Sequence, residues 1–256
     1  SVVFIFGACI GSFLNVCIYR MPLDKSVVFP GSHCPKCEKP IAFYDNIPIL
    51  SYFLLGGKCR SCKTAISPRY FLIELINASG WVFLWKMFGL SPFFAAGAIL
   101  FSVLLAVTLT DLETGLIPDK LSLPGMLAGV IFSTVWPVLH GQTVWYHGTL
   151  QSVLGLLVGG GILYAVGMLG NAVFRKESMG GGDIKLLAMM GAFLGYKKAI
   201  LIFLMSPFPA LPFALFARWF RKEETIPFGP FLAVAGLVSF LYGDFLIEFF
   251  LKIYRV

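Results

Sequence analysis

Long apolar stretches alternate with short polar connections along most of the chain. Seven of these stretches are long enough to cross about 30 Å of hydrocarbon, which takes about 20 helical residues. They cover approximately residues 2–19, 69–88, 92–110, 120–139, 149–173, 199–217 and 229–251. A shorter apolar segment, residues 183–196, contains Asp183 and Lys185, so we expect it to pack on protein as a half-buried helix. The pattern predicts an all-α polytopic membrane protein with about eight transmembrane or membrane-embedded helices.

The polar segment 20–68 interrupts this pattern. It is rich in Pro, Gly, Lys and Cys, as expected of a soluble loop with several turns. We therefore divide the chain into a first transmembrane helix (1–19), a loop subdomain (20–68) and a helical membrane domain (69–256). Because the first stretch lacks a basic leader and carries polar residues within its apolar run, we expect a mature helix rather than a cleaved signal peptide.

The composition agrees with a membrane protein. Of 256 residues, 58% are hydrophobic and 13% are charged, and the mean hydropathy is +0.84. Soluble globular domains carry about 25% charged residues. The composition therefore excludes an ordinary soluble domain.

Lys and Arg predict the orientation, because they accumulate on the cytoplasmic side of a membrane. With the loop inside, the helix ends at Asp111 to Lys120, Arg175 to Lys185 and Arg218 to Lys222 are also inside, and the N-terminus is outside. The basic residues that remain outside are Lys86, Lys197, Lys198, Lys252 and Arg255. The net charge of +7 then follows from topology and from contact with anionic lipid headgroups. No basic-aromatic stripe appears in the sequence, so we expect no nucleic-acid partner.

The loop contains two C-x-x-C pairs, Cys34 with Cys37 and Cys59 with Cys62. Two such pairs supply the four thiolates of a tetrahedral structural zinc site. Disulfides are the alternative, but they seldom persist in the reducing cytoplasm. An iron–sulfur centre and redox-active dithiols also stay open. Four thiolates would leave a zinc ion no position for substrate, so its role would be to fold the loop.

Two aspartates are predicted at the same depth on the same side of the membrane. Asp111 follows the apolar run that ends at Leu109, and Asp183 follows three glycines, Gly180, Gly181 and Gly182. Two neighbouring carboxylates share one proton, so one can act as general base on a water while the other donates to a scissile carbonyl. The sequence therefore predicts aspartyl protease chemistry, with the glycines admitting a peptide backbone to Asp183.

Three further polar residues near this pair have alternative roles. Lys185 is either a neighbouring counter-ion or an interfacial anchor. Glu113 and Asp119 fit solvated or capping acids, Asp119 because it precedes a predicted helix start at Lys120.

The sequence resembles the bacterial type IV prepilin peptidases, also called prepilin leader peptidase/N-methyltransferases. The resemblance covers nearly the whole chain and rests on several motifs together. They are Gly11 to Val16 with Tyr19 to Pro22, both cysteine pairs, Tyr44 to Tyr52, Ile66 to Tyr70 with Glu74, Asp111 with Ile117 to Asp119, and the G-x-G-D motif within Gly180 to Leu186.

The resemblance implies a bifunctional enzyme of the bacterial inner membrane. It would cleave the basic leader of type IV prepilins and pseudopilins after a glycine at the cytoplasmic face. It would then methylate the new N-terminal amine, usually on phenylalanine, using S-adenosylmethionine. By this analogy Asp111 and Asp183 are the catalytic pair, Asp119 is the rival for the first position, and the glycines and Lys185 contact substrate. Some relatives lack the cysteine loop and only cleave, so its presence here favours the bifunctional form.

The methyl-transfer site leaves a weaker trace in the sequence. No glycine-rich strand-turn-helix fingerprint appears, so any site for S-adenosylmethionine differs from the soluble Rossmann kind. The loop and its flanks offer Asn15, Asp45, Asn46 and Glu74 as cofactor-binding candidates. The alternative for each is a structural polar group that satisfies the backbone or lipid headgroups.

Two other classes compete with a membrane peptidase. An ion-coupled transporter can also carry carboxylates beside glycine breaks, but usually near the midplane of the membrane. A structural protein of a secretion assembly is the other alternative.

Overall fold

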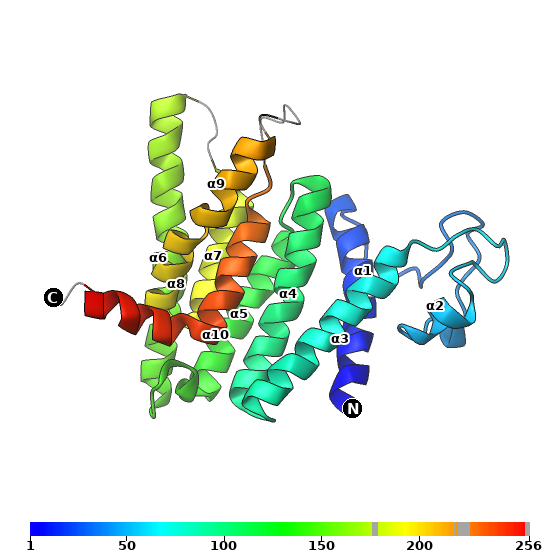
Figure 1. Cartoon of the computed structure of the whole chain (residues 1–256), viewed down its shortest axis with the longest axis horizontal. Helices are drawn as coiled ribbons and strands as arrows, with labels where there is room; N and C mark the ends of the chain where they lie inside the picture. Colours follow the sequence, from blue (N-terminus) through cyan, green and yellow to red (C-terminus); the bar gives the residue numbers. More distant parts are fainter. Residues whose placement is uncertain (176–178, 218, 220–225, 254–256) are drawn as a thin grey trace. The chain divides into compact units, whose positions relative to one another are not determined.

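A computed structural model of the chain describes residues 1–175, 179–217, 219 and 226–253. Arg218, Lys222 and Arg255, which entered the predicted orientation, lie outside the described residues. Within them the chain is nearly all helical, and it forms two compact units, Ser1–Ala106 and Val107–Val256 (Figure 1). The all-α membrane architecture is thus confirmed, while the three-part division at residues 19 and 68 stays a prediction.

The first unit is built on three long helices, and buried amides join them. Its elements are α1 (Val2–Arg20), η1 (Met21–Leu23), η2 (Phe43–Asp45), α2 (Leu50–Leu54), α3 (Pro68–Phe88) and the first part of α4 (Pro92–Thr114). Asn77 Nδ2 in α3 donates to Gly7 O in α1 over 2.7 Å. Ser102 Oγ in α4 donates to Asn77 Oδ1 over 2.9 Å. Such bonds satisfy polar groups between helices that have apolar surroundings.

The second unit surrounds one buried helix. Its elements are the end of α4, α5 (Asp119–Val135), η3 (Pro137–His140), α6 (Trp145–Phe174), α7 (Gly181–Leu194), α8 (Tyr196–Met205), α9 (Pro207–Phe216) and α10 (Gly229–Ile253). Every residue of α7 from Leu186 to Leu194 is buried. The backbones of α6 and α7 meet at Gly155 and Gly191, where a Cβ on either glycine would overlap the other's carbonyl group. The predicted segment 183–196 therefore packs on protein over most of its length.

Six helical stretches of the described chain are long and apolar enough to cross a membrane. They are Val2–Leu23, Pro68–Phe88, Pro92–Thr114, Trp145–Val173, Tyr196–Phe216 and Gly229–Ile253. The predicted count of about eight helices is therefore approximate.

Prolines shorten or divide two of the predicted helices. The expected helix 120–139 ends at Val135, since Pro137 disfavours helical backbone at Trp136, which has φ −125° and ψ 75°. The remaining α5 has 17 residues and is about 26 Å long. The expected helix 199–217 divides into α8 and α9 at Ser206, because Pro207 has no backbone N–H to continue the hydrogen-bond ladder.

Candidate functional site

Asp111 lies inside α4, four residues beyond the start of the second unit. The apolar run ends at Leu109, but the helix continues to Thr114, and Gly115 N–H donates to Asp111 O over 2.8 Å. The side chain of Asp111 is buried, with 6% of the residue exposed. Its Oδ2 accepts a hydrogen bond from the backbone N–H of Gly229, the first residue of α10, over 2.9 Å. The carboxylate is thereby held between two helices.

Asp183 lies in the first turn of α7. The chain enters this helix in an extended conformation at Gly180, with φ −69° and ψ 136°. Asp183 Oδ1 is buried and accepts no hydrogen bond from any described residue. A buried carboxylate oxygen without a donor costs free energy unless another group or a proton satisfies it. One oxygen of the Asp183 carboxyl group is therefore buried without a hydrogen-bond partner among the described residues.

The structure brings Asp111 and Asp183 together. The two carboxylates are close enough for the charge of Asp111 to act on Asp183. Ile117 lies against Gly182, which precedes Asp183, and against Gly229, which donates to Asp111. A Cβ on Gly182 would lie 2.7 Å from Ile117 Cβ, and a Cβ on Gly229 would lie 3.1 Å from Ile117 Cδ1. Two carboxylates that interact electrostatically titrate as a pair and can act as acid and base.

Asp119 occupies a different environment. It is the first residue of α5 and makes no cap, so the expectation that it caps this helix is wrong. Its two carboxylate oxygens accept from Lys185 Nζ, each over 2.7 Å, and both side chains are partly exposed. Lys185 thus has a protein partner on α5. Asp119, the alternative to Asp111 as first catalytic acid, is thus already paired with a lysine.

The four cysteines form one cluster in the first unit. The sulfur atoms of Cys34, Cys37, Cys59 and Cys62 all lie within 4.8 Å of one another, and Cys34 Sγ is 3.7 Å from Cys62 Sγ. Four sulfurs at about 2.3 Å from one ion would be about 3.8 Å apart. All four thiols are free rather than paired as disulfides. The donor set fits a single tetrahedral metal ion.

The two C-x-x-C turns have the same backbone geometry. Glu38 N–H donates to Cys34 O over 2.9 Å, and Lys63 N–H donates to Cys59 O over 3.0 Å. Backbone N–H groups of Cys37 and Lys36 lower the pKa of Cys34 to about 6. Those of Cys62 and Ser61 lower the pKa of Cys59. The backbone of each turn therefore stabilises the thiolate of its first cysteine, the form that binds a metal. The backbone N–H of Thr64 acts in the same direction on Cys62, but burial and the three neighbouring thiols raise the pKa of Cys62 to about 11.

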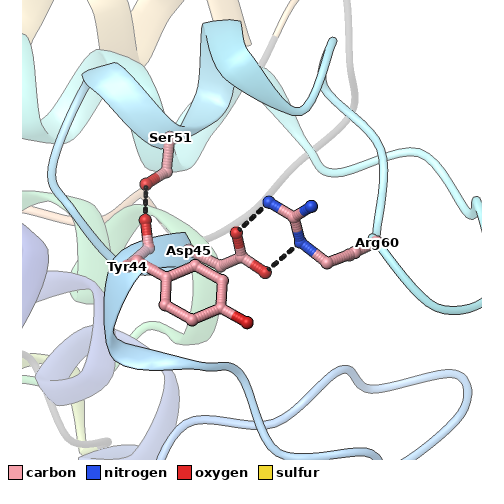
Figure 2. Close-up of polar contacts among 4 residues, drawn as sticks. All are labelled: Tyr44, Asp45, Ser51 and Arg60. Carbon is pink, nitrogen blue, oxygen red and sulfur yellow. Dashed lines mark hydrogen bonds and ion pairs between the residues drawn. The ribbon is translucent and has the colours of Figure 1, made fainter.

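Asp45 is joined to the second cysteine turn by Arg60. Arg60 Nε and Nη2 donate to the two carboxylate oxygens of Asp45 over 2.7 and 2.6 Å (Figure 2). The guanidinium also lies over the ring of Tyr44, 5.6 Å from its centroid. Hydrogen bonds from Arg60 lower the pKa of Asp45. Ser51 Oγ donates to Tyr44 O over 3.1 Å, so these contacts join η2, α2 and the second cysteine turn.

The other three cofactor-binding candidates also lie in the first unit. Asn15 Nδ2 in α1 donates to Tyr70 O in α3 over 3.1 Å. Glu74 is buried, and its Oε2 accepts from Ile49 N–H over 2.6 Å. Asn46 is exposed directly after η2. Asn15 and Glu74 therefore already bind backbone groups, as a structural role requires.

Two residues that no sequence motif indicated bind candidate site residues in the structure. Gly229 binds Asp111 although 118 residues separate them. The dipeptide Gly229-Pro230 at the start of an apolar run is a helix-entry signal, but it does not indicate a partner. Arg60 lies between two cysteines, and its charge gives no hint that it pairs with Asp45.

The chain matches known families over most of its length. Residues 5–88 match the bacterial peptidase A24 N-terminal domain, and residues 98–215 match the type IV leader peptidase family. No solved structure gives a significant match.

Curated relatives are similar over nearly the full chain. A prepilin leader peptidase/N-methyltransferase of Aeromonas salmonicida (strain A449) is 35% identical, covering 98% of this chain and 94% of the relative. Proteins of the same name from Neisseria gonorrhoeae and Pseudomonas aeruginosa are 36% and 37% identical, covering 94% and 93% of this chain and 89% and 88% of the relatives. At this identity and coverage, the chain belongs to the type IV leader peptidase family.

Proposed function

We propose that this protein is a membrane aspartic endopeptidase that cleaves the leader of prepilins and pseudopilins and then methylates the new N-terminus. The observation that carries the proposal is the proximity of Asp111 and Asp183, of which Asp183 Oδ1 is buried without a donor among the described residues. A purely structural acid would be expected to have its buried oxygens satisfied. The comparisons give no support to a transporter.

The proposed cleavage uses the two carboxylates as base and acid. An N–H donor stabilises a carboxylate, so the bond from Gly229 suits Asp111 to remove a proton from water. The water oxygen attacks the scissile carbonyl carbon while protonated Asp183 donates to the carbonyl oxygen. As the tetrahedral intermediate collapses, Asp111 gives the proton that it took from water to the amide nitrogen and the C–N bond breaks. Asp183 takes a proton back from a hydroxyl of the intermediate as the new carboxyl group forms. Gly181, where a Cβ would meet nothing within 4 Å, leaves room for an extended peptide, whereas Gly182 packs against Ile117. Lys185 contacts the substrate in this proposal.

The proposed membrane position matches such a substrate. A prepilin presents a basic leader followed by an apolar helix, so its cleavage site rests at the cytoplasmic face of the inner membrane. Asp111 lies near the C-terminal end of one apolar helix and Asp183 near the N-terminal end of another. An N-terminus outside and the loop inside place both at that face.

The test is leader removal from a purified prepilin by the full chain in detergent, followed by gel shift. Asp111→Asn and Asp183→Asn should each reduce cleavage by about 10² to 10⁴-fold. Asp119→Asn is the matched control, since Asp119 is paired with Lys185, and it should keep most of the activity. Full activity in both of the first two variants would exclude the mechanism, and inactivity of Asp119→Asn alone would reassign the first acid.

We further propose that the cysteine cluster binds one structural zinc ion. With four thiolate ligands the ion has no open position, so it would fold the loop rather than act on substrate. Metal analysis should return about one zinc per chain, and serine at all four cysteines should remove it. Iron in place of zinc, or disulfides in the protein as isolated, would contradict this assignment.

For methylation we propose that S-adenosylmethionine binds the first unit near η2. Bound there, the cofactor would supply the methyl group for the new terminal amine. Asn46 is exposed and suits a direct contact. The other three candidates already form hydrogen bonds with protein atoms, so we assign them the role of positioning Asn46 and its surroundings. They are Asp45, Glu74 and Asn15.

A leaderless peptide beginning with phenylalanine separates methylation from cleavage. With this acceptor, Asn46→Ala should raise the KM for S-adenosylmethionine and leave leader cleavage of an intact prepilin unchanged. Asp183→Asn is the converse control, because it should methylate the leaderless peptide normally. An unchanged KM in Asn46→Ala would remove Asn46 from the cofactor site.

A further inference from the structure

The short helix α2 exposes one apolar face. Leu50, Phe53 and Leu54 are 52%, 63% and 72% exposed. Residues at i, i+3 and i+4 share a face of a helix. Ser51 points the other way: it is buried and bonds to Tyr44 O. Three large apolar side chains on one side of a single helical turn indicate a surface that something covers.

Two contacts hold α2 against the first turns of α3. The ring of Tyr52 stacks on Phe71 with centroids 5.5 Å apart, and Phe53 meets the same ring edge-on at 5.1 Å. Glu74 Oε2 accepts from the N–H of Ile49, the residue before α2. Phe71 and Glu74 are three and six residues into α3, which is about 4.5 and 9 Å along the helix axis.

This attachment gives α2 a defined depth. α3 begins at Pro68 and is one of the helices able to cross a membrane. Its first turns therefore lie where headgroups meet hydrocarbon, and α2 lies beside them. Leu72 and Ile76 in the same part of α3 are also exposed, as lipid-facing residues would be. A helix with an apolar face at this depth can bury that face about 5–10 Å into the boundary of headgroups and acyl chains.

The charge of the loop complements an anionic surface. Residues 20–68 contain seven Lys and Arg against three Asp and Glu. Asp45 and Arg60 neutralise each other, which leaves six basic residues against two acids. Lys58 follows α2 closely, and Lys58 and Lys63 are exposed. Basic residues beside a membrane-spanning helix are attracted to anionic headgroups.

We propose that α2 is an interfacial anchor: its Leu50, Phe53 and Leu54 face inserts into the bilayer surface, and basic residues of the loop bind anionic headgroups. This contact fixes the four-cysteine subdomain to the membrane next to α3. The anchor depends only on the membrane position of α3 and not on the peptidase proposal.

The first test places a benzophenone amino acid at Leu54 of the full chain in nanodiscs that contain phosphatidylglycerol. Irradiation should produce lipid adducts, detected by mass, in about tenfold higher yield than the same probe at Glu38. Glu38 is the matched control, because it is exposed, lies in the first cysteine turn and is not one of the basic residues proposed to bind headgroups. Equal yields at the two positions would overturn the proposal. So would adducts at Leu54 that join two chains or another part of the protein.

Unaltered protein provides a second test that does not depend on the folding of a variant. Amide hydrogen exchange of residues 51–55 should be about tenfold slower in phosphatidylglycerol nanodiscs than in phosphatidylcholine nanodiscs. Equal exchange rates in the two lipids would contradict recognition of anionic headgroups.

Discussion

The backbone N–H of Gly229 donates to Asp111 Oδ2 over 2.9 Å, and no space for a side chain remains between them. A Cβ at position 229 would lie 2.7 Å from Asp111 Oδ2, closer than real Cβ contacts allow. Gly229→Ala must therefore move either the carboxylate or the start of α10. We expect kcat/KM for leader cleavage to fall about 10²-fold, because small displacements of a catalytic group have effects of that size.

Gly161→Ala is the matched control for this variant. Gly161 lies in α6, and a Cβ there meets nothing within 4 Å. We expect full cleavage activity and a slightly raised melting temperature, because alanine stabilises helix interiors by about 0.5–1 kcal/mol relative to glycine. Equal activity of Gly229→Ala and Gly161→Ala would show that the Gly229 contact does not position Asp111.

The three glycines before Asp183 should differ in their tolerance of alanine. A Cβ at Gly182 would lie 2.7 Å from Ile117 Cβ, whereas a Cβ at Gly181 meets nothing within 4 Å. We expect Gly182→Ala to cost about 1–3 kcal/mol of stability by overpacking and to reduce cleavage. Gly181→Ala should leave the melting temperature unchanged, so any loss of cleavage in that variant would report on substrate approach. Equal melting temperatures for the two variants would contradict the close packing of Ile117 against Gly182.

The ion pair of Lys185 and Asp119 should contribute little to stability. Both side chains are partly exposed to solvent, and surface ion pairs contribute about 0–1 kcal/mol. A double-mutant cycle with Lys185→Ala and Asp119→Ala, followed by thermal unfolding, should give a coupling energy within that range. A proposed contact of Lys185 with substrate predicts in addition that Lys185→Ala raises KM while Asp119→Ala does not. A loss of kcat in Asp119→Ala would instead implicate this acid in catalysis.

His140 should make stability depend on pH. Its Nε2–H bonds to Ser133 Oγ over 2.8 Å, and Ser133 Oγ bonds to Ala192 O at the end of α7. Burial, with a smaller effect of the charge on Lys198, lowers the pKa of His140 from 6.5 to about 4. Between these values the unfolded chain binds the proton and the folded protein does not. The contribution of neutral His140 to the free energy of unfolding is therefore fully present above pH 6.5. It is lost as the pH falls toward 4, by up to about 3 kcal/mol.

The measurement is thermal unfolding in detergent at about pH 7.5 and about pH 5. The melting temperature should fall between the two conditions more for the unaltered protein than for His140→Gln, which cannot take up the proton. Equal decreases would mean that His140 is not held neutral by its surroundings.

The sequence alone determined the membrane class, the main helices and the identity of the key side chains. Apolar runs of about 20 residues must form helices in a bilayer, because their backbone groups have no water to bind. Thus α1, α3, α4, α6 and α10 lie close to their predicted ranges. The two C-x-x-C pairs predicted one metal cluster, because a repeated local turn brings pairs of sulfurs together.

Helix ends and divisions were harder to predict, since apolarity marks the part of a helix in lipid and not where the helix stops. α4 continues one turn beyond its apolar run, so Asp111 lies within the helix rather than after it. Prolines at positions 137 and 207 altered two other predicted helices.

Tertiary structure alone decided the partners of the charged groups. Asp119 and Lys185 are separated by 66 residues, so the sequence did not predict that they form an ion pair. This pairing distinguishes Asp119 from Asp111, whereas the sequence left both as candidates for the first catalytic acid. Gly229 reaches Asp111 and Arg60 reaches Asp45 only after the helices and the cysteine turns have packed. Hydropathy and motif spacing are properties of one segment at a time. A hydrogen bond between distant segments depends on how helix surfaces fit together. The sequence therefore identified the charged and polar side chains, and only the tertiary structure determined which of them bind one another.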